Sequence, residues 1–158
     1  MKEEKQGKAN RRDARRLALQ ILYAVEYTGS TPEDVVREYG DLEPFLCGAM
    51  NLFTKQLLES VFQHKEELDS RLQKVITNWK MDRLSCLDRN ILRLAGAEIF
   101  HFGDIPPKVT INEYIDIARE FGNQDSPSFV NGILDRLAKE SEKREDINGK
   151  GNGAGGGT

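Results

Sequence analysis

The distribution of proline is the feature that most limits how this chain folds. Its five prolines lie at positions 32, 44, 106, 107 and 127, so the segment from Phe45 to Ile105 has none. Proline interrupts a helix because it lacks an amide proton and its ring clashes with the preceding turn. Between the prolines, apolar residues recur every three or four positions, and no segment alternates as a strand does. The sequence therefore predicts an all-α protein.

This periodicity predicts a compact bundle of about seven helices. Six of them are expected at about residues 11–27, 45–63, 65–78, 86–102, 110–122 and 126–143, and a short helix is expected to begin at Thr31. Thr31, Ser85 and Ser126 are expected N-caps, and Thr110 to Glu113 form a capping-box pattern. The 86–102 helix is apolar around most of its circumference, which predicts a central position in the fold.

Two further residues are given structural interpretations. Glycine is disfavoured inside a helix, so Gly132 is expected to allow a close contact between helices. Trp79 is expected in the core rather than on the surface as a stacking platform.

Composition and motifs argue against several functional classes. Cys47 and Cys86 form no CxxC pair, and His64 and His101 are isolated in the sequence. None of the GxSxG, HExxH, Walker-type or GxGxxG patterns is present. No apolar run approaches the roughly 18 residues of a membrane span, and no signal peptide is apparent. We therefore expect a cytoplasmic protein that is not an enzyme and has no cofactor, metal or membrane association.

Charge and composition divide the chain into three parts. Residues 1–10 are expected to be a flexible basic arm, 11–147 a single helical domain, and 148–158 a disordered glycine-rich tail. The first twenty residues hold seven basic and three acidic side chains, although the whole chain has a net charge of −3. A basic arm on an acidic body is typical of nucleic-acid binding, and a solvated terminus is the alternative.

The surface of the first helix supports the same hypothesis. On a helical wheel, Arg12, Arg16 and Tyr23 fall opposite the apolar stripe. Cations for phosphates beside a ring for a base suit single-stranded RNA. Alternatively, Tyr23 packs on another helix of the same domain.

Ordered sequence blocks then carry a family resemblance. They are Arg12-Asp-Ala-Arg15, Ala18-Leu-Gln20-Ile-Leu-Tyr23, Trp79 followed by Arg83-Leu84, Asp88-Arg-Asn-Ile-Leu-Arg-Leu-Ala95 with Glu98, Asp104-Ile-Pro-Pro107, Ile111-Asn112-Glu113, and Phe129-Val-Asn-Gly132-Ile-Leu-Asp135. With these blocks the chain resembles the NusB family of transcription antitermination factors from about Arg11 to Leu137.

The resemblance implies two helical subdomains and a binding function. Family members bind a single-stranded boxA element in ribosomal RNA leader or phage transcripts, together with NusE, a protein of the small ribosomal subunit. The complex joins RNA polymerase and other Nus factors, so that elongation resists termination.

The resemblance also implies site residues. The expected RNA-binding residues, with Arg16 added from the helix surface, are Arg12, Arg15, Arg16, Tyr23, Asp125, Ser126 and Phe129. The expected NusE contacts are Tyr23, Tyr27 and Asp88. Phe129 falls in the first turn of a helix, where its ring is placed either to stack on a base or to anchor the loop to the body.

Some features depart from the family pattern. Family members often have a basic residue where this chain has Ser128, and Asp13 interrupts the arginines. These departures leave open a protein-interaction adaptor with only non-specific RNA contact. NusB-like domains also occur fused to ribosomal RNA methyltransferases, but only about 20 residues follow Leu137, so an enzyme is not expected.

Overall fold

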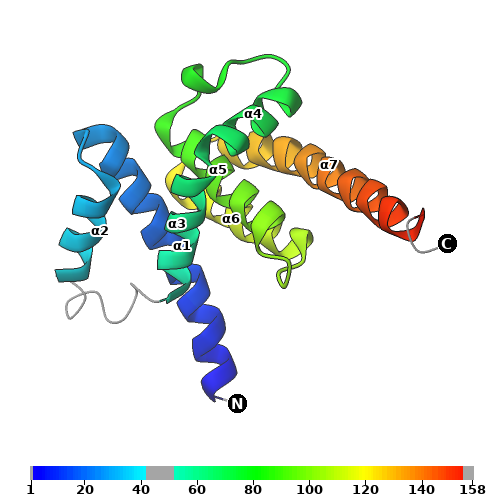
Figure 1. The fold of residues 1–158 in the computed structure, drawn as a ribbon. Helices are drawn as coiled ribbons and strands as arrows, with labels where there is room; N and C mark the ends of the chain where they lie inside the picture. Colours follow the sequence, from blue (N-terminus) through cyan, green and yellow to red (C-terminus); the bar gives the residue numbers. More distant parts are fainter. Residues whose placement is uncertain (1, 42–51, 155–158) are drawn as a thin grey trace.

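The computed structural model describes residues 2–41 and 52–154 (Figure 1). Within these ranges the chain forms α-helices and one short 3-10 turn, and no strand. The elements are α1 (Lys2–Thr28), α2 (Pro32–Asp41), α3 (Leu52–Gln63), α4 (Lys65–Val75), η2 (Met81–Arg83), α5 (Cys86–His101), α6 (Pro107–Phe121) and α7 (Ser126–Ala154). The prediction of an all-α fold with seven helices is confirmed.

Helix α5 lies at the centre of the bundle. It packs against α1, α3, α4, α6 and α7, and every residue from Asn90 to Ile99 is buried. One group of helices, α1–α3, lies on one side in Figure 1, and α4, α6 and α7 make up the rest of the bundle. Each fully buried Leu or Ile side chain contributes about 1.5–3 kcal/mol of transfer free energy. Because α5 buries such side chains against helices of both groups, it is the main link between them.

Two of the predicted helix caps are present. The Thr31 hydroxyl accepts a hydrogen bond from the amide of Asp34 at 3.2 Å. The Ser85 hydroxyl accepts one from the amide of Asp88 at 3.1 Å. Each satisfies an amide that the helix itself leaves without a partner.

The predicted start of α6 and the predicted capping residue of α7 are corrected. Helix α6 begins at Pro107 rather than at Thr110, and the Thr110 hydroxyl is buried and donates to Glu98 at 3.2 Å. Proline already has the backbone angle of a first helical residue, so it starts the helix three residues earlier. At α7 the capping side chain is Asn123, whose Oδ1 accepts from the amides of Asp125 and Ser126 at 2.9 and 3.1 Å.

The interpretation of Gly132 is wrong. A Cβ atom added there would meet no atom within 4 Å, so no neighbouring helix requires a glycine. The close approach is at Gly122, between α6 and α7. A Cβ there would lie 2.5 Å from the Ser126 Cβ and 2.8 Å from the Ala118 carbonyl oxygen.

Some predictions concern parts of the chain that the structure describes incompletely. Helix α1 includes positions 2–10 of the expected arm, and α7 includes positions 148–154 of the expected tail. Residues 45–51, the expected start of the third helix, and 155–158 lie outside the described residues, as does Cys47. The division into arm, domain and tail stays a prediction. No helix of the described ranges is long and apolar enough to span a membrane.

We expect Gly122→Ala to destabilise the fold by about 1–3 kcal/mol, because the new methyl group overlaps Ser126 and the α6 backbone. Gly103→Ala is the matched control, since a Cβ there meets nothing within 4 Å. Urea unfolding followed by circular dichroism measures both variants. Equal stability of the two would contradict the close approach at Gly122.

Candidate nucleic-acid interface

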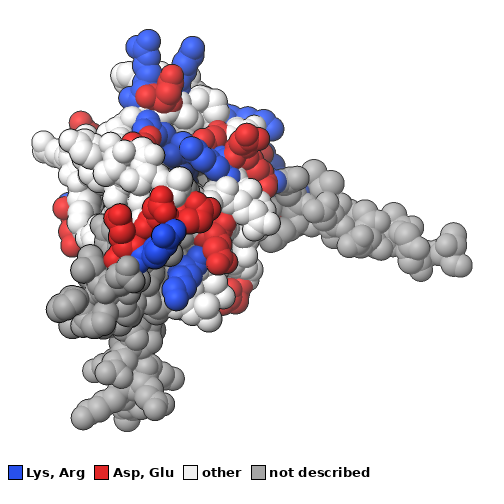
Figure 2. Space-filling model, turned by 60° about the vertical axis from the view of Figure 1, so that its left-hand side comes forward, with Lys and Arg blue, Asp and Glu red and all other residues white. Residues whose placement is uncertain are grey.

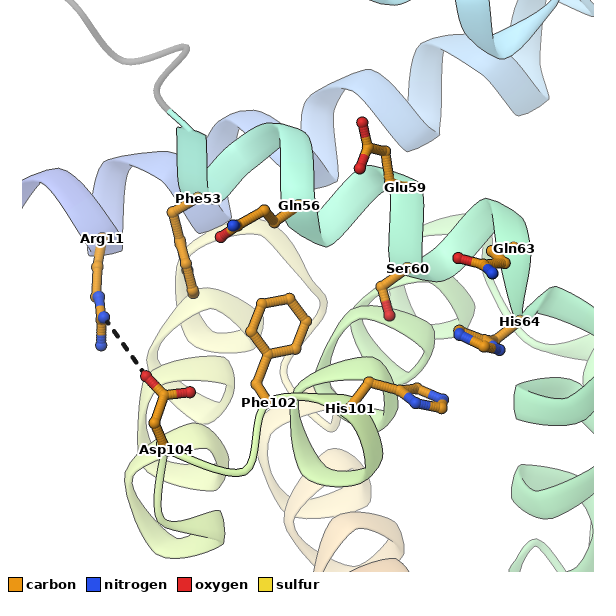
Figure 3. Close-up of a pocket in the computed structure, with 10 residues that line it drawn as sticks. All are labelled: Arg11, Phe53, Gln56, Glu59, Ser60, Gln63, His64, His101, Phe102 and Asp104. Carbon is orange, nitrogen blue, oxygen red and sulfur yellow. Dashed lines mark ion pairs between the residues drawn. The ribbon is translucent and has the colours of Figure 1, made fainter.

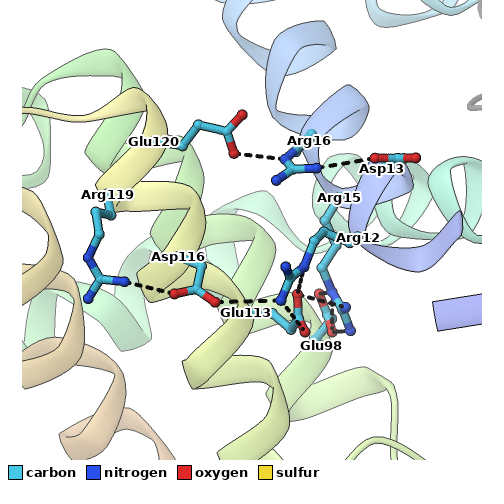
Figure 4. Close-up of polar contacts among 9 residues, drawn as sticks. All are labelled: Arg12, Asp13, Arg15, Arg16, Glu98, Glu113, Asp116, Arg119 and Glu120. Carbon is cyan, nitrogen blue, oxygen red and sulfur yellow. Dashed lines mark hydrogen bonds and ion pairs between the residues drawn. The ribbon is translucent and has the colours of Figure 1, made fainter. Parts of the chain in front are cut away.

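The arginines of α1 are paired with carboxylates (Figure 4). Arg12 bonds Glu113 at 3.1 Å and lies 3.5 Å from Asp116, both on α6. Arg16 bonds Glu120 of α6 at 2.8 Å and Asp13 at 3.2 Å. Both arginine side chains remain partly exposed, so the pairs lie at the surface.

Arg15 has a different environment. Its side chain is only 4% exposed, and its Nε and Nη2 atoms bond Glu98 of α5 at 3.0 and 2.8 Å. Burial opposes its charge, but the hydrogen bonds and the charge of Glu98 outweigh burial and raise the pKa of Arg15. The structure therefore places this expected RNA contact inside the bundle, where it holds α1 on α5.

Opposite charges alternate over the visible surface. Figure 2 shows Lys and Arg side chains next to Asp and Glu side chains, without one continuous basic patch on that face. The basic surplus expected for the first helix is thus compensated, among the described side chains, by the carboxylates of α6.

The start of α7 brings together three other predicted residues. Phe129 lies in the first turn and is partly buried against the core, and Asp125 is exposed. Ser126 is buried, and its hydroxyl accepts from the Asn123 amide at 3.0 Å. Ser126 therefore shapes the turn, whereas Asp125 and part of the Phe129 ring face solvent.

A hollow of about 200 Å³ lies beside Phe129. Its lining residues are Ile76, Thr77, Asn78, Trp79, Ser128, Phe129, Gly132, Ile133 and Arg136. Because Gly132 has no side chain, α7 leaves room between the Phe129 and Arg136 side chains. This hollow is smaller than the roughly 300–1,000 Å³ of a typical small-molecule pocket.

Trp79 lies at this hollow, and its predicted position in the core is wrong. It is 58% exposed. The Gln73 amide donates to the Trp79 carbonyl at 3.0 Å and accepts from the Met81 amide at 2.9 Å. These bonds end α4 at Val75 and fix the connector with the indole outward. The sequence feature that could have predicted this exposure is the polar run Thr77-Asn-Trp-Lys80 between two helices.

The predicted partner residues gather where the C-terminal end of α1 meets the start of α5. Tyr23 and Tyr27 are 40% and 78% exposed, and their rings stack with centroids 5.8 Å apart. The Tyr23 ring thus contacts Tyr27 of its own helix and stays partly exposed. Asp88 is buried, and its Oδ1 has no hydrogen-bond partner among the described residues.

Glu26 fixes this end of α1 to α5. It accepts hydrogen bonds from Arg89, from Asn90 at 2.8 Å and from the Cys86 thiol at 2.9 Å. Burial opposes its charge, but the three donors prevail and lower the pKa of Glu26. Burial and the Glu26 carboxylate raise the pKa of the Cys86 thiol to about 11.

The fold and these surface groups define a helical binding protein, with exposed rings, a shallow hollow and charged side chains at the ends of packed helices. The NusB family model matches residues 12–139. The chain therefore belongs to the NusB family.

Individual relatives agree with this assignment. The transcription antitermination protein NusB of Desulfitobacterium hafniense is 39% identical over 139 residues, covering 87% of this chain and 93% of the relative. That of Geotalea daltonii is 40% identical over 144 residues, covering 87% and 99%.

Solved structures share the fold. T. maritima NusB superposes with a TM-score of 0.69 at 31% identity, covering 82% of this chain and 91% of that one. A crystal structure of the antitermination factors NusB and NusE in complex with dsRNA superposes with a TM-score of 0.72 at 26% identity, covering 84% and 98%.

We expect Arg15→Ala to lower the free energy of unfolding by about 3–5 kcal/mol, because it leaves Glu98 buried without its partner. Arg16→Ala, which breaks only surface pairs, is expected to change it by less than about 1 kcal/mol. Urea unfolding of both variants measures the difference. If Arg15→Ala were as stable as Arg16→Ala, the buried pair would not be what holds α1 on α5.

Proposed function

We propose that this chain is a transcription antitermination factor that binds boxA-type single-stranded RNA of ribosomal RNA leader transcripts together with NusE. It acts in the cytoplasm, within the RNA polymerase elongation complex and beside other Nus factors, and it catalyses no reaction. Family membership and the likeness to a NusB–NusE structure with dsRNA support this proposal. The observation that carries it is the hollow between Trp79 and Phe129.

The two rings supply what a single strand needs. Bases of an unpaired strand stack on aromatic faces, each stacked base contributing about 1–3 kcal/mol. Trp79 presents its indole to solvent, and Phe129 lies in the first turn of α7, where the positive end of the helix dipole attracts a phosphate. The exposed carboxylate of Asp125 accepts hydrogen bonds from base amino groups nearby. Ser126 supports this surface from inside.

Arg12 and Arg16 are proposed to contact phosphates by exchanging partners. In the free protein they are bound to Glu113, Asp116 and Glu120, so a phosphate competes with an existing ion pair. This competition reduces the gain in free energy from each contact. RNA affinity of the chain alone is therefore modest and increases when NusE adds its own contacts. Arg15 positions α1 and does not touch RNA.

Tyr23, Tyr27 and Asp88 are proposed as the NusE surface. Two stacked and exposed tyrosines present a large apolar area with hydroxyl groups at its edge, which is typical of interface anchors. The Oδ1 of Asp88 is buried without a partner among the described residues, so a NusE donor reaches it only when this side chain turns outward on binding. Tyr23 thus serves NusE rather than RNA in this proposal.

A protein-interaction adaptor is the second candidate, and the paired arginines favour it. Such an adaptor binds boxA-like and scrambled RNA equally. The fluorescence of Trp79 in the wild-type protein distinguishes the two candidate functions, because Trp79 is the chain's only tryptophan and lies at the hollow.

The test is a fluorescence titration with boxA-like and scrambled RNA, each with and without NusE, at two salt concentrations. We expect boxA-like RNA to quench Trp79 and to bind more tightly with NusE present. Equal weak binding of both RNAs without quenching would support the adaptor.

We expect Trp79→Ala and Phe129→Ala each to weaken boxA binding by about 5- to 150-fold, the loss of one stacked base. Val109→Ala, an exposed apolar residue at the start of α6, is the control. Fluorescence anisotropy of labelled RNA gives the affinities, and circular dichroism checks the fold. If Phe129→Ala binds normally, Phe129 is only a hydrophobic anchor.

We expect Glu120→Gln to strengthen RNA binding, since it removes the α6 carboxylate that competes with a phosphate for Arg16 and leaves only the pair with Asp13. The slope of log K against log salt becomes steeper by about 0.7, the value for one additional phosphate contact on a single strand. Glu38→Gln on α2 removes the same charge elsewhere and controls for net charge. An equal gain in both variants would point to general electrostatics and exclude partner exchange at Arg16.

A further inference from the structure

The two histidines of the chain, isolated in the sequence, meet in the fold. His64 joins α3 to α4, and His101 is the last residue of α5. Their rings stack with centroids 3.8 Å apart and planes 12° from parallel. Figure 3 shows them side by side at one end of a cavity. Residues from two helix ends therefore form one imidazole pair.

Glu67 completes the cluster. Its Oε2 lies 3.4 Å from His64 Nδ1 and 4.0 Å from His101 Nε2. One ligand atom from each of the three residues lies within 4.8 Å of the others. Ligand atoms at about 2.0–2.2 Å from one tetrahedral metal ion lie roughly 3.3–3.6 Å apart. The Glu67–His64 pair already has this spacing, and His101 has to move closer on binding.

The Glu67 carboxylate is already oriented by a second partner. Its Oε1 accepts from Arg71 Nη2 at 2.9 Å, and the Arg71 guanidinium lies over the Phe100 ring at 4.2 Å. Oε1 is thereby occupied and Oε2 is directed to the histidines. Outer partners of this kind fix the orientation of metal-binding carboxylates.

The adjoining cavity has a volume of about 450 Å³ and opens to solvent. Ser60 lines it, and its Oγ is buried without a hydrogen-bond partner among the described residues. In Figure 3 this hydroxyl points into the space between Phe102 and His101, while Arg11 and Asp104 lie at the opposite end. The two imidazoles thus border a cavity through which an ion and its water can enter.

From this geometry we infer that His64, Glu67 and His101 bind one divalent transition metal ion such as Zn²⁺. Two imidazoles and a carboxylate are donors that zinc accepts and that Mg²⁺ and Ca²⁺ do not favour. Three protein ligands leave a fourth position to water from the cavity. Because the lone pairs lie in the ring planes, the partly exposed imidazoles turn out of their parallel stack on binding.

The site has a structural consequence separate from RNA binding. It shares no residue with the Trp79–Phe129 hollow. A bound ion would connect the α3–α4 junction to the C-terminal end of α5, two points far apart in the sequence. Since an ion held by the folded chain alone stabilises it, binding is expected to raise Tm.

The experiment uses untagged protein, free of added histidines. Zn²⁺ is titrated in competition with a chromophoric chelator, and Co²⁺ is added separately to record its visible absorption. We expect one equivalent of Zn²⁺, a tetrahedral-type Co²⁺ spectrum, and a Tm higher by several degrees. His64→Ala, Glu67→Gln and His101→Ala are each expected to lose at least about tenfold in affinity. Glu66→Gln, the adjacent exposed carboxylate of α4, is the matched control and keeps wild-type affinity.

A second measurement needs no variant. The chain has two histidines, so a histidine-selective ¹⁵N NMR spectrum contains only their two rings. Both rings are expected to shift together as Zn²⁺ is added. Absence of binding, a shift of one ring alone, or equal affinity of the three variants and wild type would overturn the inference.

Discussion

The buried pair of Arg15 and Glu98 is the interaction on which the remaining arrangement depends. It joins α1 to the central α5. The Thr110 hydroxyl of α6 donates a hydrogen bond to the same Glu98 carboxylate at 3.2 Å, so α6 is tied to this pair as well. A buried carboxylate without its partner is strongly unfavourable, so α1 has one favourable position against α5. That position sets Arg12 and Arg16 beside the carboxylates of α6. The charge pattern of the surface thus follows from an interaction in the interior.

Local sequence patterns predicted those parts of the fold that local interactions decide. The apolar periodicity located the helices. Helix α5 is central because apolar residues cover most of its circumference. The caps at Thr31 and Ser85 involve amides three residues away, which is within reach of a sequence pattern. The Thr110 pattern failed because the preceding proline starts the helix and because Glu98, from another helix, takes the hydroxyl.

The candidate site was only partly predictable for the same reason. The resemblance identified Phe129, and the structure places it in the first turn of α7 as expected. Arg15 has the residue type of an RNA contact, but its partner Glu98 lies 83 positions away and no local pattern shows it. Trp79 is exposed because Gln73 bonds the connector backbone, and hydrophobicity alone predicted the opposite. The histidine pair also depends on contacts between separate helices.

The central place of α5 also has a consequence for synthesis of the protein. Helices α1 and α3 both pack on α5, which begins only at Cys86. While the chain leaves the ribosome, the first three helices are complete before α5, which covers part of the apolar surface of α1 and α3, has been made. Exposed apolar surface in a nascent chain attracts chaperones and favours aggregation. Folding of this protein is therefore expected to wait for the second half of the chain, so that a truncated N-terminal half would not form a stable unit.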